Sequence, residues 1–225
     1  MKTIKIISVV LRGLPNTLTL LVASFFLAAT LGIFLAWLNL RKNRLARSIA
    51  RLYLGLVRGT PPLLMLLLLL AYFGLPVLLK SIGIDIDHWT RMTFGILGLT
   101  IGWSAYLSEA FRSAYLSVDP GQLEAARSVG MSDRHSFWQI IVPQTAMIAL
   151  LNIENLLIGL VKATSLVYVI GLYDMYNQAT NLSNQTSGVY QLKIFIILAL
   201  IYWAIVLLIE WGFRLIRDHY AKMMA

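Results

Sequence analysis

Four polar side chains within one apolar stretch of this sequence could act on a solute. Asn152, Asn155 and Lys162 recur at helical spacing, with Gly159 between them, so they share one face of a helix. Buried amides and charges are expensive in hydrocarbon, so this face should meet water or protein. The spacing predicts either the lining of a pathway for a polar solute or a helix–helix contact in which the asparagines hydrogen-bond across the interface.

The fourth side chain is Glu154, which lies about 110° from that stripe by the helical period. It can bind the ammonium group of a substrate, or it can pair with a basic group of another helix. Both interpretations stay open from the sequence. Lys162 is predicted at the outer mouth of the pathway.

Enzymatic chemistry has little support in the sequence. The chain has no cysteine, and His88, His135 and His219 lie too far apart to form a metal-ligand spacing. It has no nucleophile elbow, no paired catalytic carboxylates and no G-x-x-x-x-G-K-[ST] sequence for ATP. We therefore predict that the chain is not an enzyme and carries no cofactor of its own.

Composition indicates that lipid is the solvent for much of the chain. Of 225 residues, 59% are hydrophobic and only 13% are charged, with a mean hydropathy of +0.75, whereas soluble domains average about 25% charged residues. The net charge of +9 comes from basic residues that flank apolar runs, which is typical of membrane anchors rather than of nucleic-acid binding. The sequence predicts an all-α membrane protein with a single transmembrane domain over residues 1–225.

Apolar runs long enough to cross a bilayer predict five transmembrane helices. The segment 163–173 is apolar but too short to cross, so we expect a re-entrant or interfacial piece, and the polar segment 177–188 is predicted to be an exposed loop. Basic residues are more numerous on the face that holds the loop 41–58, which predicts an external N-terminus and a cytoplasmic C-terminus. The five spans are near 14–39, 60–79, 92–108, 142–161 and 194–213.

The segment between the third and fourth spans predicts a helical hairpin in the cytoplasm. Asp119 is a good N-cap, Pro120 suits the first helical position, and Gln122 completes a capping box. The first helix should run to about Val129, and Gly130 fits a left-handed position that ends it.

A second short helix should follow, capped by Ser132 and covering 133–141, with Pro143 ending it or opening the next span. From the residues alone, the hairpin is either a connector on the membrane surface or a docking element.

Fixed spacings in this hairpin resemble the EAA signature of ABC importer permeases, E-A-A-x3-G-x9-I-x-L-P. Glu124-Ala125-Ala126 is followed at the matching distances by Gly130 and by Ile140-x-Val142-Pro143, where the family prefers Leu to Val142. The resemblance implies a type I importer permease core whose coupling helix docks on a cytoplasmic ATPase. It assigns Glu124, Ala125, Ala126 and Gly130 to that contact.

Further motifs resemble one branch, the polar amino-acid uptake permeases, over roughly residues 13–210. The family's K-D-T-S-L is here Lys162-Ala163-Thr164-Ser165-Leu166, without its acidic residue. The resemblance places Asn152, Glu154, Asn155, Lys162, Thr164 and Ser165 along the substrate pathway. The missing acid favours cystine-type or other zwitterionic substrates over basic ones. The other matching motifs are Gly13-x-x-x-Thr17-Leu18, Arg58-Gly59-Thr60-Pro61, Tyr72-Phe73-Gly74-Leu75-Pro76 and Ser104-Ala105-Tyr106-x-x-Glu109.

The family implies the partners of such a chain. They are a second permease subunit (identical or related), two ATPase subunits that hold ATP and magnesium, and an extracytoplasmic amino-acid-binding protein. The assembly would lie in the bacterial inner membrane and import polar amino acids by alternating access.

The alternative function is a self-contained secondary amino-acid transporter driven by ions, with Glu154 and Lys162 as coupling charges. Its weakness is that the five spans show no internal inverted repeat, which such folds often have. Arg58 and Glu109 fall at similar depth in spans two and three, which predicts an ion pair between them. The sequence Gly59-Thr60-Pro61-Pro62 predicts a hinge or a sharp entry turn.

Overall fold

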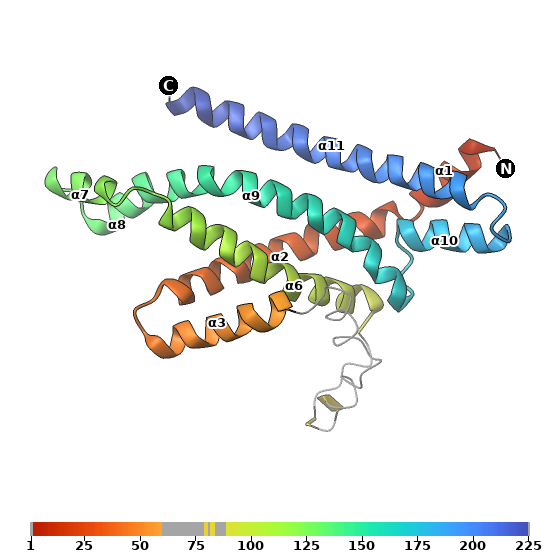
Figure 1. The fold of residues 1–225 in the computed structure, drawn as a ribbon, viewed down its shortest axis with the longest axis horizontal. Helices are drawn as coiled ribbons and strands as arrows, with labels where there is room; N and C mark the ends of the chain where they lie inside the picture. Colours follow the sequence, from red (N-terminus) through yellow and green to blue (C-terminus); the bar gives the residue numbers. More distant parts are fainter. Residues whose placement is uncertain (1, 60–78, 81, 84–88, 225) are drawn as a thin grey trace.

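The described part of the chain is a bundle of long helices in the computed structural model (Figure 1). The structure describes residues 2–59, 79–80, 82–83 and 89–224, and these residues form helices and turns without a β-strand. Nearly all of the predicted second span at 60–79 lies outside the described residues. The predicted helix break after Gly59 and the motif at residues 72–76 also lie outside them.

Long helices account for four of the predicted spans, and shorter ones for the connections. The described elements are α1 (Thr3–Leu11), α2 (Leu14–Leu40), α3 (Arg44–Gly59), α6 (Arg91–Leu116), α7 (Gly121–Ser128), α8 (Asp133–Ser136), a π-helix (Phe137–Ile141), α9 (Val142–Ala163), a 3-10 helix (Thr164–Ile170), α10 (Met175–Gln185) and α11 (Gln191–Met224).

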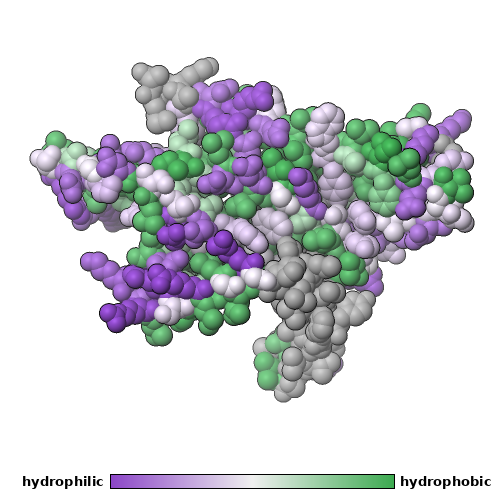
Figure 2. All heavy atoms as spheres, viewed as in Figure 1, coloured by the Kyte–Doolittle hydropathy of each residue, from purple (hydrophilic) through white to green (hydrophobic). Residues whose placement is uncertain are grey.

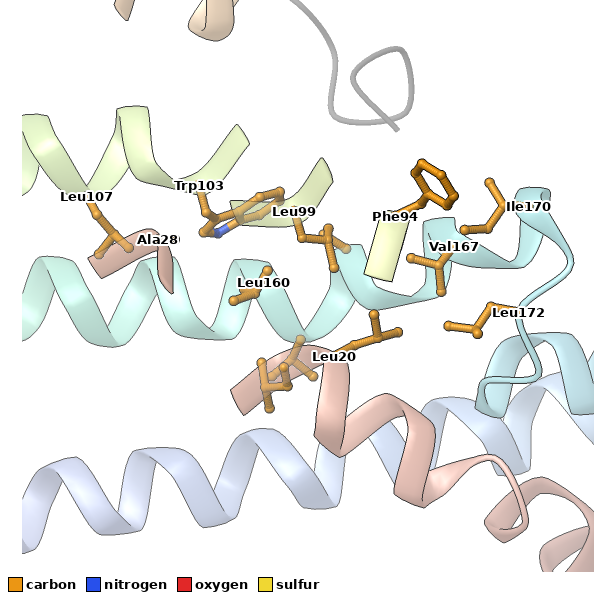
Figure 3. Packing of buried hydrophobic residues seen from close by; sticks show 13 residues of the cluster. Leu20, Ala28, Phe94, Leu99, Trp103, Leu107, Leu160, Val167, Ile170 and Leu172 are labelled. Carbon is orange, nitrogen blue, oxygen red and sulfur yellow. The ribbon is translucent and has the colours of Figure 1, made fainter. Parts of the chain in front are cut away.

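Helix α6 is the centre of the bundle and packs against α2, α3 and α9. Small residues permit close packing: a Cβ atom at Gly32 of α2 would lie 3.0 Å from the Cβ of Leu107. The main apolar core lies between α2, α6, α9 and the 3-10 helix and includes Leu20, Leu99 and Leu160 (Figure 3). Trp103 ties α6 to α9, since its indole N–H donates to the backbone carbonyl of Leu156 at 2.9 Å.

Membrane-spanning character is strongest in three stretches of the described residues: Thr3–Leu40, Asp133–Ile170 and Gln191–Tyr220 are long and apolar enough to cross. At 26 residues, α6 is also long enough at about 39 Å, but it carries Arg91, Glu109 and Arg112. The described residues therefore confirm the all-helical architecture, whereas the count of five transmembrane helices is not confirmed.

The two ends of the bundle are different (Figure 1). The N-terminus, α1 and α10 lie at one end, and α7, α8 and the C-terminus lie at the other. Hydrophilic side chains gather over α3 (Figure 2). This helix and the turn before it carry five arginines and one lysine: Arg41, Lys42, Arg44, Arg47, Arg51 and Arg58.

The predicted separate helix at 133–141 is wrong in one respect, because it runs without a break into the fourth span. Ser132 caps α8 as expected, accepting the backbone N–H of His135, but a π-helix then joins α8 to α9. The N–H of Val142 bonds to the carbonyl of Phe137, five residues back. This wider turn accommodates Pro143, which has no N–H and whose ring would crowd an ordinary α-helical turn.

The predicted exposed loop at 177–188 is also wrong, since most of it forms α10. The carboxylate of Asp174 caps this helix by accepting the N–H groups of Asn177 and Tyr176. Met175, Ala179 and Leu182 are buried at spacings of four and three, so one face of a polar sequence packs on the bundle.

The short apolar segment at 163–173, predicted to be a re-entrant or interfacial piece, continues the long apolar stretch Asp133–Ile170 up to residue 170. Its first part forms the 3-10 helix, which buries Thr164, Val167 and Ile170 and ends at Gly171 with a φ of 71°. It extends α9 and packs into the core rather than lying apart from it.

Candidate functional site: an exposed hairpin and the polar face of α9

The α7–α8 hairpin turns at Gly130 with the geometry that the sequence predicts. Gly130 has a φ of 82°. The N–H of Met131 bonds to the carbonyl of Ala126, and the N–H of Gly130 bonds to that of Arg127, each at 3.0 Å. This pair of bonds is the Schellman motif, in which a left-handed glycine ends a helix.

An ion pair closes the hairpin, and the sequence analysis missed it. The guanidinium of Arg127 donates to the carboxylate of Asp133 at 2.8 Å, and this bond lowers the pKa of Asp133 below its usual range. Opposite charges flanking a predicted glycine turn were the available signal. The helix α7 begins at Gly121, one residue later than predicted, with Pro120 rather than Asp119 at the N-cap position. The Asp119 carboxylate still accepts the N–H of Gly121 at 2.9 Å.

The outer surface of the hairpin is charged and apolar. Glu124, Ala125 and Gly130 are exposed, whereas Ala126 is buried within the hairpin itself. Ala126 therefore shapes the hairpin from within, and the other three are open to a partner. The apolar side chains of Val129, Phe137 and Trp138 are also exposed, and the rings of Phe137 and Trp138 lie 5.5 Å apart. Adjacent exposed apolar side chains mark an interaction surface.

The predicted polar stripe of α9 lies on the surface of the single chain. Asn152, Asn155 and Lys162 are all exposed. Within the described residues, the side chains of these three make no hydrogen bond or ion pair. Such groups in a spanning helix require water or a second protein surface, so the exposed stripe fits a pathway or an interface with another subunit.

Glu154 points away from that stripe into a contact with another helix. It is buried, and its carboxylate accepts a bond from the guanidinium of Arg217 on α11. Of the two alternatives, the structure contains the pairing with a basic group. The pair links α9 to α11.

The last two pathway candidates have local partners at the end of α9. Thr164 is fully buried, and its hydroxyl donates to the carbonyl of Val161 at 2.7 Å. Ser165 is half-buried, and its hydroxyl donates to the carbonyl of Lys162 at 2.7 Å. Thr164 is thus a core residue, whereas Ser165 stays close to Lys162 at the surface.

The ion pair predicted between Arg58 and Glu109 is not the one that forms. The Glu109 carboxylate binds Arg112 instead, with two bonds of 3.0 and 2.5 Å. Arg112 is one helical turn further along α6, so this pair needs no particular packing of α3 on α6. Arg58 lines the same groove as this pair.

A buried clamp at the opposite end of the bundle joins the N-terminal motif to the turn before α10. A Cβ atom at Gly13 would lie 2.3 Å from the backbone carbon of Asp174, so only glycine fits. The Thr17 hydroxyl accepts the N–H of Met175 at 3.2 Å, and the Asn16 amide donates to the carbonyl of Tyr173 at 2.8 Å. The Gly-x-x-x-Thr spacing was the only signal, and it did not reveal the partner.

Asp174 is the one carboxylate at this clamp, and its side chain is fully buried. Burial raises its pKa to about 6, against the opposing effect of the two backbone N–H groups that it accepts. The clamp therefore contains a carboxyl group whose protonation changes close to neutral pH.

Comparison with known proteins assigns the chain to one family. Residues 28–222 match the family model described as the binding-protein-dependent transport system inner membrane component. The match covers most of the sequence, and the chain belongs to this family.

Curated relatives carry amino-acid transport names. The chain is 34% identical over 209 residues to the L-cystine transport system permease protein TcyL of Bacillus subtilis (strain 168), a match that covers 93% of this chain and 86% of the relative. It is 35% identical over 183 residues to the histidine/lysine/arginine/ornithine transport system permease protein HisQ of Salmonella typhimurium (strain LT2), covering 80% of this chain and 79% of the relative.

A solved structure supports the same fold. The crystal structure of an amino acid ABC transporter with histidines superposes with a TM-score of 0.81 at 30% sequence identity, covering 96% of each chain. The chain is therefore a transport subunit of an ABC importer rather than an enzyme.

Proposed function

We propose that this chain is the transmembrane subunit of an ATP-driven importer of polar amino acids, which pairs with a second permease subunit in a bacterial inner membrane. The single observation that carries this proposal is the exposed α7–α8 hairpin with the EAA spacing around Gly130. Its turn has a left-handed glycine closed by two backbone hydrogen bonds, and the apolar side chains of Val129, Phe137 and Trp138 are exposed. A separate ATPase, which binds ATP and magnesium, docks there and drives alternating access.

The substrate class follows from the relatives and from one substitution. TcyL is named for L-cystine, and HisQ is named for basic amino acids. Ala163 stands where the polar amino-acid branch has an acidic residue, which removes a partner for a cationic side chain. We infer a zwitterionic substrate, with L-cystine as the first to test, delivered by an extracytoplasmic binding protein.

The orientation follows from the two ends of the bundle. If α7 and α8 meet a cytoplasmic ATPase, the C-terminus at the same end is cytoplasmic and the N-terminus is external (Figure 1). The basic residues of the segment 41–58 then lie on the cytoplasmic side, in agreement with the positive-inside rule. The whole chain acts as one transmembrane domain, and Asn152, Asn155, Lys162 and Ser165 lie along its pathway.

Reconstitution tests the function directly. Proteoliposomes that hold the permease complex, its ATPase and its binding protein should accumulate labelled L-cystine only with ATP. Vesicles that hold this chain alone should not accumulate it under a proton or sodium gradient. Gradient-driven accumulation without the ATPase would identify a secondary transporter and overturn the proposal.

A variant of the hairpin tests its coupling role. Glu124 is exposed and outside the membrane bundle, so Glu124→Ala should leave the permease folded. If its charge meets a basic group on the ATPase, truncation costs on the order of 2–5 kcal/mol of binding free energy. Co-purification of the ATPase should fall accordingly, and Glu124→Asp should restore part of it. Unchanged co-purification and unchanged ATP hydrolysis would show that the carboxylate has no coupling role.

A further inference from the structure

An open groove lies between α9, α10 and α11 beside the polar stripe. It has a volume of about 590 Å³, within the range of small-molecule sites. Lys162 and Ser165 line one side, Glu210 of α11 lines another, and the aromatic rings of Phe195 and Trp203 complete it. The groove thus combines one cation, one anion and aromatic surface.

The two charged residues of α9, Glu154 and Lys162, each lie near a charged residue of α11. Glu154 of α9 already binds Arg217 of α11. Lys162 follows Glu154 by eight residues, and Glu210 precedes Arg217 by seven. The two helices run in opposite directions (Figure 1). Each separation is about two helical turns. Lys162 and Glu210 therefore both lie about two turns from the Glu154–Arg217 ion pair, toward the end of the bundle that holds α10.

Glu154 is paired with Arg217, whereas the charges of Lys162 and Glu210 have no ion-pair partner in the described part of the chain. Lys162 and Glu210 nevertheless line the same groove. Lys162 is exposed and Glu210 is half-buried. Uncompensated charges in a spanning segment are costly and face water or a ligand. A ligand that satisfies both must carry an anionic and a cationic group.

We propose that this groove binds a zwitterionic amino acid, with the Lys162 ammonium on its carboxylate and the Glu210 carboxylate on its ammonium group. Phe195 and Trp203 contact the substrate side chain. This assignment rests on the proposed import function and adds Glu210, which no motif in the sequence indicated. Lys162 and Glu210 are binding residues, and Glu154 and Arg217 fix the spacing of the two helices that carry them.

Uptake kinetics of the complete complex test the assignment. In proteoliposomes with the ATPase and binding protein, Lys162→Met and Glu210→Gln should each raise the KM for L-cystine by at least about 10-fold, the factor expected from losing one charge-assisted hydrogen bond. Asp218→Asn, which neutralises an exposed charge on α11 outside the groove and two helical turns from Glu210, should leave KM within about 2-fold of the parent.

Analogue discrimination and a charge exchange separate binding from a structural ion pair. The parent should prefer L-cystine to its dimethyl ester, and Lys162→Met should lose that preference, which a merely structural lysine would not affect. The double variant Lys162→Glu with Glu210→Lys should stay inactive, because the substrate would have to reverse. Full recovery by the double variant would show that the two residues pair with each other, and unchanged KM in both single variants would overturn the site.

Labelling supplies a measurement that does not depend on these variants. The chain has no cysteine, so Ala199→Cys, in the lining of the groove, is its only thiol. A charged, membrane-impermeant methanethiosulfonate should modify it in the assembled complex. Absence of modification would place the groove against lipid and overturn the site. If the parent complex shows no ATP-driven uptake of any amino acid, the proposed function fails. If the parent complex is active and the variants have the same KM as the parent, only the groove assignment fails.

Discussion

Two glycine-containing turns at opposite ends of the bundle differ in how much of their surface the rest of the chain covers. At the α7–α8 hairpin, Gly130 adopts a left-handed conformation, and a Cβ atom there would meet nothing within 4 Å. At the other end, a Cβ atom at Gly13 would collide with the backbone of Asp174. The Gly13–Asp174 clamp is buried and internally bonded, whereas the hairpin leaves Glu124, Phe137 and Trp138 exposed.

The difference indicates which region needs a partner. A turn whose polar groups pair within the chain contributes to stability, because its bonds are complete without another molecule. A turn that presents charge and apolar surface outward gains its contacts only from another molecule. Substitutions in the clamp should therefore change unfolding, and substitutions in the hairpin should change binding of the ATPase.

The largest effect is expected at the clamp. Gly13→Ala places a methyl group about 2.3 Å from a backbone carbon, so α2 or the turn before α10 must move, at a cost of about 3 kcal/mol or more. The thermal unfolding midpoint of the purified chain should fall sharply, along with its yield in membranes. Gly55→Ala is the matched control, since a Cβ atom there meets nothing within 4 Å. Equal stability of the two variants would contradict the clamp.

The next effect concerns pH. The pKa of Asp174 is raised from 3.8 to about 6 in the folded state. The folded chain therefore binds this proton more tightly, and the free energy of unfolding falls as pH rises from about 4 to 6, by roughly 2–3 kcal/mol in total. The decrease is complete about one pH unit above 6, and at higher pH the contribution of Asp174 to the free energy of unfolding is constant.

Asp174→Asn should remove that dependence while keeping an N-cap oxygen for α10. Its unfolding midpoint should exceed that of the parent at pH 7.5, and the gap should close near pH 4. A gap of the same size at both pH values would show that the ionisation of Asp174 does not affect folding.

A smaller effect is expected at the hairpin turn, and it should appear in binding rather than in folding. Gly130→Val forces a β-branched residue to a φ of 82°, at a local cost of about 1–2 kcal/mol. The hairpin should change shape and retain less ATPase on co-purification, with the unfolding midpoint of the spans unchanged. Gly130→Asn tolerates the left-handed conformation and should bind normally. Loss of membrane-inserted protein in Gly130→Val would contradict the division between the two ends.

The smallest effect is expected at Thr17. Thr17→Val removes the acceptor for the N–H of Met175 and should lower stability by about 1 kcal/mol. Thr17→Ser keeps the hydroxyl and serves as the control. If the two variants unfold at the same temperature, the hydroxyl contributes nothing to the clamp.

Much of the fold was predictable because local chemistry determines it. The ends of α2 and α9 follow from charges and prolines that bound apolar runs, and the turn at Gly130 follows from a glycine after a capped helix. The polar stripe of α9 followed from helical periodicity alone. These features depend on neighbours in sequence, and their prediction needed no knowledge of packing.

Features that depend on distant partners were not predictable. The sequence of α10 resembles a loop because its polar residues outnumber its three buried apolar residues, Met175, Ala179 and Leu182. Their burial depends on packing against the rest of the bundle. Glu109 forms an ion pair with Arg112 on its own helix instead of with Arg58. Glu154 pairs with Arg217, which is 63 residues away in the sequence. No local pattern pointed to Glu210, since its role depends on the crossing of α9 and α11.

The most direct test of the account is a footprint of the ATPase on the hairpin. Ala125 is exposed, and the chain has no natural cysteine, so Ala125→Cys reports this surface alone. Maleimide labelling should be rapid in the free permease and at least about 10-fold slower once the ATPase is bound, because a desolvated interface excludes the reagent. Asn184→Cys, exposed at the opposite end on α10, should label equally in both states. Undiminished labelling of Ala125→Cys in an active complex would contradict docking at the hairpin.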